Sequence, residues 1–167
     1  KIRWTGINAA TVSQRARVTA ERMPQGNGGP EQLLRLSHRP VLPESVRVFV
    51  TREGGQLEEW TQIDDLYNAG AEVPVPDPRL PAHLPKRQTN ARVFVCDAEA
   101  GELRFGDGAR GARPPLGADI VVDYEYSEGR EGNVNEGAIK SGPMLPPGFT
   151  VTNPVSTWGG ADAGTVA

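Results

Sequence analysis

Apolar and polar residues alternate most clearly along residues 45–51, where the apolar positions are Val46, Val48 and Val50. A period of two with β-branched residues predicts a strand that buries one face. Glu53-Gly54-Gly55 then supplies a turn, and residues 58–63 (Glu-Glu-Trp-Thr-Gln-Ile) are predicted as the returning strand. We therefore expect an antiparallel hairpin in this part of the chain.

The same pattern recurs in the second half of the chain. Residues 92–96 and 102–105 predict a second hairpin around a turn at 97–101, and residues 119–126 predict the most regular strand. One face of that strand carries Ile120, Val122, Tyr124 and Tyr126, whereas Asp123 and Glu125 make the other face polar. Weaker strand patterns lie at residues 16–21, 33–36 and 149–152, and a short helix is expected around residues 63–68.

Long irregular segments separate these strands. Residues 73–85 hold five prolines among thirteen residues, which favours extended polyproline conformation and argues against a central strand. Segments 106–117 and 129–137 carry glycines at spacings that suit tight turns. The predicted structural turn residues are Gly106, Asp107, Gly108, Gly117, Gly132 and Asn133. The expected fold is mainly β, an antiparallel, sandwich-like domain with long Gly- and Pro-rich loops and little helix.

Composition narrows the function classes. The 167 residues carry 18 basic and 21 acidic side chains, a net charge of −3, which is unlike the basic footprint of a nucleic-acid binder or a polybasic membrane segment. Cys96 is the single cysteine, so an intramolecular disulfide and a thiolate metal cage are excluded. His38 and His83 are the only histidines and lie far apart in the sequence, without the spacing of a metal-binding motif. No apolar run approaches the roughly 18 residues of a membrane-spanning helix. We expect no cofactor, no resident metal, no nucleic-acid partner and no membrane partner.

The ends of the chain suggest that it is part of a larger polypeptide. It begins at Lys1 and finishes beyond a glycine- and alanine-rich run at residues 159–164. We expect residues 1–25 to be a connecting segment or edge strand and residues 26–152 to be a β-rich domain. Residues 153–167 are then a linker to the next domain of the parent chain.

The run Leu103-Arg104-Phe105-Gly106-Asp107-Gly108 is the nearest approach to a metal loop, because its aspartate lies between glycines as in some calcium-binding turns. Calcium takes six to eight oxygen ligands, yet Ala109-Arg110-Gly111 follow. We favour a tight turn in which Asp107 accepts hydrogen bonds from neighbouring amides while the flanking glycines adopt left-handed conformations.

No arrangement of residues predicts catalysis. The adjacent pairs Glu58-Glu59 and Asp64-Asp65 would point to opposite faces of a strand, so neither pair converges on one substrate bond. Ser37 and His38 are neighbours in sequence, which is not the geometry of a catalytic triad. The glycine-rich segments 26–29 and 129–133 lack the Lys-Ser/Thr pair of a phosphate-binding loop. We expect neither enzymatic activity nor a small-molecule substrate.

Aromatic and arginine side chains suggest contacts with other molecules. The three tryptophans, Trp4, Trp60 and Trp158, are candidates for a sugar-stacking platform, although a core or an interface would also use them. Fifteen of the 18 basic residues are arginine, which is favoured where bidentate contacts to carboxylates fix an interface. The candidate interface residues are Trp60, Arg110, Arg113 and Trp158.

Residues 101–164 resemble a known family when they are taken as one string. The motifs are Leu103-Arg104-Phe105-Gly106-Asp107-Gly108, Gly111-Ala112-Arg113-Pro114-Pro115-Leu116-Gly117-Ala118-Asp119-Ile120, Tyr124-Glu125-Tyr126, Gly132-Asn133-Val134, Gly137-Ala138-Ile139, Val151-Thr152-Asn153-Pro154 and Gly159-Gly160-Ala161-Asp162. Upstream, Gly26-Asn27-Gly28-Gly29-Pro30-Glu31-Gln32, Arg39-Pro40-Val41-Leu42-Pro43 and residues 59–66 extend the likeness. The chain resembles the baseplate assembly proteins, the J-like wedge family of contractile-tailed phages and phage-derived contractile injection systems. It departs from that family at residues 127–131, where a glycine cluster is usual, and at Trp158, where the family has a small or polar residue.

This resemblance implies a structural subunit without an active site. It implies contacts with other baseplate wedge and hub proteins and with further copies of the same parent protein. In that role the domain would join neighbouring baseplate proteins and help relay the contraction trigger. It also implies assembly in the bacterial cytoplasm into a phage virion or a contractile injection particle, which is released outside the cell. The alternative is a β-sandwich module that binds a glycan or a host surface, with an exposed aromatic cluster around Trp60 or Trp158. A hydrolase ranks last.

Overall fold

The computed structural model describes residues 13–51, 54–74, 90–142 and 145–160, and the chain divides into two compact units. Residues 16–126 form what we call the sheet unit, and residues 1–15 with 127–167 form what we call the paired-segment unit. The two units divide the chain after residues 15 and 126. The first strand, Ala16–Met23, lies at an edge of the sheet, within the segment 1–25 that we expected to be a connecting segment or edge strand. The proline-rich segment predicted at residues 73–85 lies almost wholly outside the described residues.

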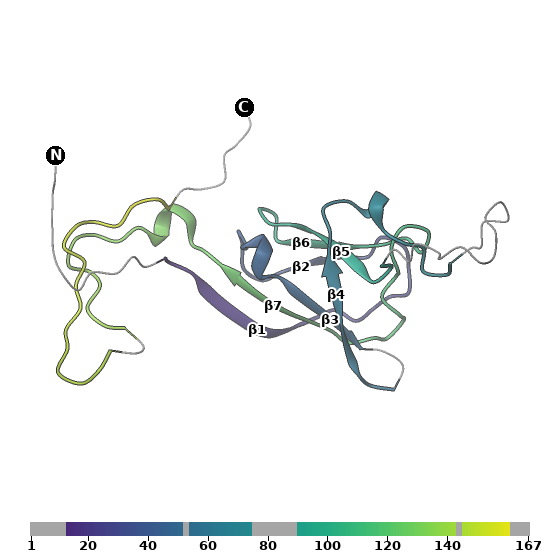
Figure 1. Cartoon of the computed structure of the whole chain (residues 1–167), viewed down its shortest axis with the longest axis horizontal. Helices are drawn as coiled ribbons and strands as arrows, with labels where there is room; N and C mark the ends of the chain where they lie inside the picture. The colour runs from purple at the N-terminus through teal and green to yellow at the C-terminus, as the bar shows by residue number, and fades with distance from the viewer. Residues whose placement is uncertain (1–12, 52–53, 75–89, 143–144, 161–167) are drawn as a thin grey trace, which may run out of the picture. The chain divides into compact units, whose positions relative to one another are not determined.

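One curled sheet of seven strands makes up the sheet unit, with the spatial order β1-β7-β3-β4-β5-β6-β2 (Figure 1). The strands are β1 (Ala16–Met23), β2 (Leu33–Arg35), β3 (Arg47–Thr51), β4 (Leu57–Gln62), β5 (Val93–Asp97), β6 (Glu102–Phe105) and β7 (Ile120–Tyr126). The prediction of a mainly β fold is confirmed.

The sheet is mixed rather than purely antiparallel. All neighbouring strands are antiparallel except β4 and β5, which pair in parallel at Thr61–Val93 and Gln62–Phe94. A parallel pair needs a crossover of a dozen or more residues, and the long connection from residue 63 to residue 92 provides it. The period-two pattern predicts each strand but contains no information on the direction of its neighbour.

Most of the predicted strands are confirmed. The two predicted hairpins are β3–β4 and β5–β6, the regular strand at 119–126 is β7, and the weaker patterns at 16–21 and 33–36 are β1 and β2. The strand predicted at 149–152 is wrong, since that segment has no ladder partner. The prolines at 146, 147 and 154 flank it and cannot donate to a ladder, which disfavours a strand there.

Helical structure among the described residues is limited to short 3-10 turns. These are η1 (Pro43–Ser45), η2 (Leu66–Asn68) and η3 (Gly129–Gly132). The helix expected at 63–68 is therefore the single turn η2, whose start is capped by the Asp65 side chain accepting from the Tyr67 N–H. Within the same residues, no helix has the length and apolar character needed to cross a membrane.

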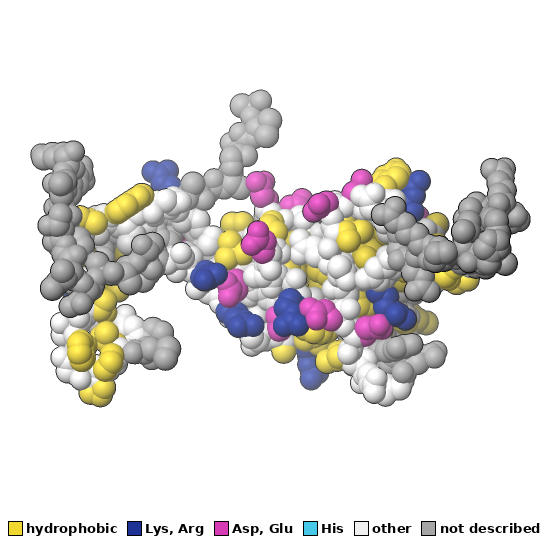
Figure 2. Space-filling model, in the orientation of Figure 1, with side chains coloured by type: hydrophobic (Ala, Val, Ile, Leu, Met, Phe, Trp, Pro, Cys, Tyr) yellow, Lys and Arg dark blue, Asp and Glu magenta, His cyan; other side chains and the backbone are white. Residues whose placement is uncertain are grey.

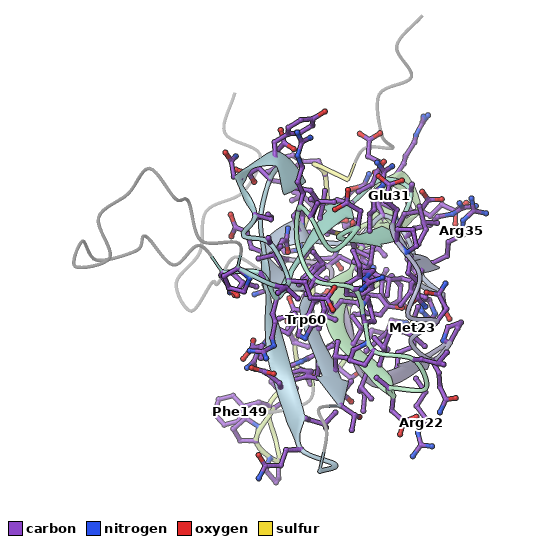
Figure 3. The ribbon with its side chains drawn as sticks, turned by 90° about the vertical axis from the view of Figure 1, so that its right-hand side faces the viewer. Arg22, Met23, Glu31, Arg35, Trp60 and Phe149 are labelled. Carbon is purple, nitrogen blue, oxygen red and sulfur yellow. The ribbon has the colours of Figure 1, made fainter. Side chains whose placement is uncertain are left out.

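Side chains from nearly every strand meet in one hydrophobic core inside the curl of the sheet. The largest buried residues include Tyr124, Phe94, Phe105, Leu103, Ile120, Val48, Val50 and Val122. Trp60 packs edge-on against Phe105 with ring centres 5.3 Å apart, and Figure 3 shows it among the interior side chains, whereas Arg22 and Arg35 extend outward. The apolar faces predicted from period-two spacing in residues 46–50 and 120–124 are the faces that the core uses.

A β-bulge in β1 decides which of its side chains face the core. Val18 pairs with Tyr124 but Glu21 pairs with Val122, so β1 has one residue more than β7 across this stretch. Ala20 takes a left-handed φ of 54°, and its N–H donates to Asp123 Oδ1 at 2.7 Å. The extra residue moves the inward positions from even to odd numbers, and Glu21 and Met23 therefore face inward.

Candidate functional site

The predicted turn around Asp107 is present. Asp107 Oδ1 accepts the N–H groups of Arg110 at 2.7 Å and Ala109 at 2.9 Å, and these backbone hydrogen bonds hold the pKa of Asp107 below its usual range. Gly108 has the left-handed φ, 96°, that the prediction assigned to it. The carboxylate is therefore engaged in holding the turn, which is the alternative that we favoured over a metal loop.

Gly106 serves the turn for a different reason from the one predicted. Its φ is not left-handed, which contradicts the sequence-based expectation. A Cβ at this position would instead overlap the carbonyl group of Gly111 and the carbonyl oxygen of Arg110, well inside van der Waals distance. Glycine is required because two backbone segments pass against each other, and single-sequence patterns do not reveal such an approach.

Two of the predicted interface arginines are held by neighbouring side chains. The Arg110 guanidinium lies over the Tyr67 ring, with its central carbon 3.8 Å from the ring centre. Arg113 Nε donates to Glu72 Oε2 at 2.9 Å, and this bond lowers the pKa of Glu72. Both pairs lie at the protein surface, and both arginines are already engaged in contacts within the chain.

The turn borders a pocket of about 320 Å³ in the sheet unit. Its wall carries four carboxylates, from Glu31, Asp64, Asp65 and Asp107, and two guanidiniums, from Arg104 and Arg110. Tyr67, Leu66 and Val95 supply the less polar part of the lining. Asp107 and Arg110 are thus brought together with residues of η2, β5 and β6, a grouping that the sequence did not indicate.

Trp60 is not an interface residue. Only 5% of it is exposed, and it is part of the hydrophobic core, so this prediction is wrong. The cause is its position in β4, where residues alternate between the core and the solvent and Trp60 falls on the core side. Trp158 has the opposite environment, since 81% of it is exposed. An exposed aromatic cluster around Trp60 is therefore excluded.

In the paired-segment unit, two stretches of backbone are fastened together by asparagine side chains. Asn133 Nδ2 donates to the carbonyl of Gly160 at 2.9 Å, and the Gly160 N–H donates back to Asn133 Oδ1 at 3.1 Å. Asn153 Oδ1 accepts the Ile139 N–H at 2.9 Å, while its Nδ2 donates to the carbonyls of Asn135 and Val155. Main-chain bonds between Val134 and Thr157 and between Gly137 and Asn153 complete the pairing.

Gly132 and Gly117, the remaining predicted turn glycines, differ from each other. Gly132 ends η3 without a left-handed φ, and a Cβ there would crowd the Gln14 side chain of the same unit. Gly117 has a φ of 77° and open space around it, next to the exposed Leu116. Left-handed backbone thus explains Gly117, whereas a side chain at position 132 would require only the movable end of Gln14 to shift.

A polar cluster that the sequence did not indicate lies beside β1 and β7. Glu21 Oε1 accepts the Ser37 hydroxyl at 2.5 Å, and the Tyr124 hydroxyl lies 3.2 Å from both the main-chain nitrogen and Nδ1 of His38. The His38 ring stacks on Tyr126 with centres 4.3 Å apart. Burial, followed by the Glu21 carboxylate, raises the pKa of Tyr124 to about 12. The cluster fastens the loop after β2 to the sheet.

Other ionisable groups are arranged as surface pairs. Figure 2 shows basic and acidic side chains interspersed on the visible face of the sheet unit, and Arg47 donates to both carboxylate oxygens of Glu59 at 2.8 and 2.9 Å. Among the described residues, no three His, Cys, Asp or Glu side chains are placed to hold one metal ion together. No protein-family model, curated protein or solved structure matches the chain.

Proposed function

We propose that the chain is a non-enzymatic structural domain of a baseplate wedge subunit in a contractile tail or injection system. The resemblance of residues 101–164 to that family supports the proposal. The observation that carries it is the pairing of Gly132-Asn133-Val134 and residues 137–139 with residues 153–160. These motifs, separated in sequence, share one task, which is to fix the shape of a loop pair.

A protein that joins neighbours and passes on a mechanical trigger needs loops that keep their shape. The Asn133 and Asn153 side chains replace the regular ladder of a sheet with specific side-chain bonds, so the two segments are held without belonging to a strand. Preformed loops lose little conformational entropy when they dock. The paired-segment unit therefore has the preformed loops expected of a domain that contacts its neighbours, a role that requires no reactive side chains.

Large apolar side chains on this unit are available for contacts. Phe149 is 68% exposed and Trp158 is 81% exposed. Aromatic side chains contribute disproportionately to protein interfaces because they bury a large rigid surface. We propose that these residues contact other wedge or hub subunits, or further copies of the same parent protein, within an assembled virion or injection particle.

The proposal is tested in particles assembled with the full parent protein. We would compare Trp158→Ser and Phe149→Ser, alone and together, with an in-frame deletion of residues 39–153. Both aromatic side chains are exposed, so the substitutions should leave the domain folded, which circular dichroism of the purified chain would verify. Leu57→Ser is the matched control, because Leu57 is an exposed apolar residue of β4 in the sheet unit.

Negative-stain electron microscopy gives the decisive readout. We expect the deletion and the double substitution to yield particles without complete baseplates, whereas the control assembles normally. Intact contractile particles that fail only to attach to cells would overturn the wedge proposal and favour the alternative of a module that binds a glycan or host surface. Intact particles that also attach normally would leave this chain no structural role in the baseplate.

A further inference from the structure

The pocket beside the Asp107 turn is built from elements whose positions are fixed in advance. Asp65 caps η2 by accepting the Tyr67 N–H at 2.9 Å, and Asp107 holds its own turn through two amides. Glu31 is tied to the same turn, because its N–H donates to the Gly106 carbonyl at 3.0 Å. Arg104 and Val95 lie opposite each other in the β5–β6 ladder. A ligand would therefore meet a preformed site.

Three charged side chains of this pocket have no hydrogen-bond or ion-pair partner among the described residues: Glu31, Asp64 and Arg104. Two of them accept hydrogen bonds and one donates several. Such a mixture matches a ligand that both donates and accepts at closely spaced positions. The volume of about 320 Å³ lies at the lower end of the range for small-ligand pockets.

Tyr67 adds an aromatic surface to these polar groups. It is 72% exposed, and Arg110 covers one face of its ring at 3.8 Å, which holds the ring in position and leaves the opposite face for a ligand. The C–H face of a polyhydroxylated ring packs well against an aromatic ring, while the hydroxyls around the edge of that ligand reach the neighbouring charged groups. The combination of an aromatic ring with acidic and basic hydrogen-bonding groups is suited to a polyhydroxylated ring.

The charge of the lining discriminates between kinds of ligand. An anionic ligand would face the carboxylates of Glu31, Asp64, Asp65 and Asp107, and a cationic side chain would face the guanidiniums of Arg104 and Arg110. A neutral polyol avoids both repulsions, and its hydroxyls can replace the water that hydrates the exposed Glu31, Asp64 and Arg104 side chains. We propose that this pocket binds a neutral saccharide, stacked on Tyr67 and hydrogen-bonded by Glu31, Asp64 and Arg104. The inference stands independently of the wedge proposal.

The test is a titration of the isotope-labelled full chain with glucose, galactose and N-acetylglucosamine, followed by two-dimensional amide NMR. We expect saturable shifts at millimolar sugar for amides of residues 64–67 and 104–110. Tyr67→Ala should weaken binding about tenfold or abolish it, and Asp64→Asn should weaken it less because the amide retains one acceptor oxygen. Trp158→Ala is the matched control, since it removes an exposed aromatic side chain from the other unit.

Three results would overturn the inference. One is the absence of shifts with all three sugars up to tens of millimolar, in a chain whose spectrum is that of a folded protein. Another is binding that survives Tyr67→Ala but is lost in Trp158→Ala, which would place the sugar on the paired-segment unit. The third is a response of the pocket amides to a lysine- and arginine-rich peptide but to none of the sugars, which would identify a pocket for protein side chains.

Discussion

Gly106 is the position where one added methyl group should disturb the candidate site most. Its backbone lies against Arg110 and Gly111, so the Cβ of Gly106→Ala would overlap main-chain atoms, which cannot turn aside as a flexible side chain can. The substitution can be accommodated only if the segment around residues 110–111 moves away. We therefore expect a larger effect than a change of backbone preference would produce.

The magnitude follows from the hydrogen bonds that close this turn. The Asp107 N–H donates to the Arg110 carbonyl at 3.3 Å, and the Gly108 N–H donates to the Gly111 carbonyl at 2.9 Å. Each intramolecular hydrogen bond contributes about 1 kcal/mol net, and loss of packing at the buried Gly106 adds to this. We expect Gly106→Ala to lower the free energy of unfolding by about 2–4 kcal/mol.

Gly117 and Gly108 separate this steric effect from backbone strain. Gly117→Ala forces alanine into a left-handed φ of 77° with open space around the new methyl group, and should cost about 1 kcal/mol. Gly108→Ala should cost a similar amount, because the atoms near its Cβ belong to the movable side chains of Arg113 and Glu72. Gly106→Ala should therefore be the most damaging of the three.

Urea unfolding followed by circular dichroism measures these differences, and thermal melts provide a second estimate. For a chain of this length, each kcal/mol should lower Tm by about 2–4 °C. The reasoning would be refuted if Gly106→Ala were as mild as Gly117→Ala with an unchanged urea dependence. In that case the close approach of the two backbone segments would not constrain residue 106.

Three further predictions test other parts of the molecule. Because the pKa of Tyr124 is raised from 10.0 to about 12, its contribution to stability is complete below pH 10 and is lost as the pH rises toward 12. The free energy of unfolding of the wild type should therefore fall more steeply between pH 10 and pH 12 than that of Tyr124→Phe. Equal slopes would contradict the raised pKa of Tyr124. Burial, followed by the charge of Asp97, raises the pKa of the Cys96 thiol from 9.0 to about 11. Iodoacetamide at neutral pH should therefore alkylate the folded chain about 100-fold more slowly than the urea-unfolded chain. Comparable rates would show that the thiol is accessible and that its pKa is unperturbed. Asn153→Ala removes three side-chain hydrogen bonds. The Ile139 amide should therefore exchange with solvent on the order of tenfold faster than in the control Thr152→Ala. Unchanged exchange would show that Asn153 does not hold the two paired segments together.

Local sequence patterns were sufficient to predict the strands that have one face in solvent and the other in the core. The valines of β3 and the apolar positions of β7 have the period of two that a half-buried strand requires, and both strands lie where that pattern predicts them. The Asp107 turn was predictable for a similar reason, because an aspartate accepts hydrogen bonds from amides two and three residues ahead of it.

Contacts between distant residues decided the remainder. In β1, the extra residue of the β-bulge moves Glu21 and Met23 to the inner face, although no alternation in residues 16–23 indicates it. Trp60 was predicted as an interface residue because its type suits both a core and an interface, whereas its place on the core side of β4, against Phe105, decides for the core.

The candidate site was the least predictable feature. Its pocket joins Glu31, the residues of η2, Arg104 of β6 and the Asp107 turn, which approach one another only because the sheet curls and β5 crosses back to lie parallel to β4. The sequence by itself determined the strands and turns, since those depend on neighbours within a few residues. Tertiary structure alone decided the strand order, the need for glycine at position 106 and the grouping of charges around Tyr67, because these depend on segments that are distant along the chain.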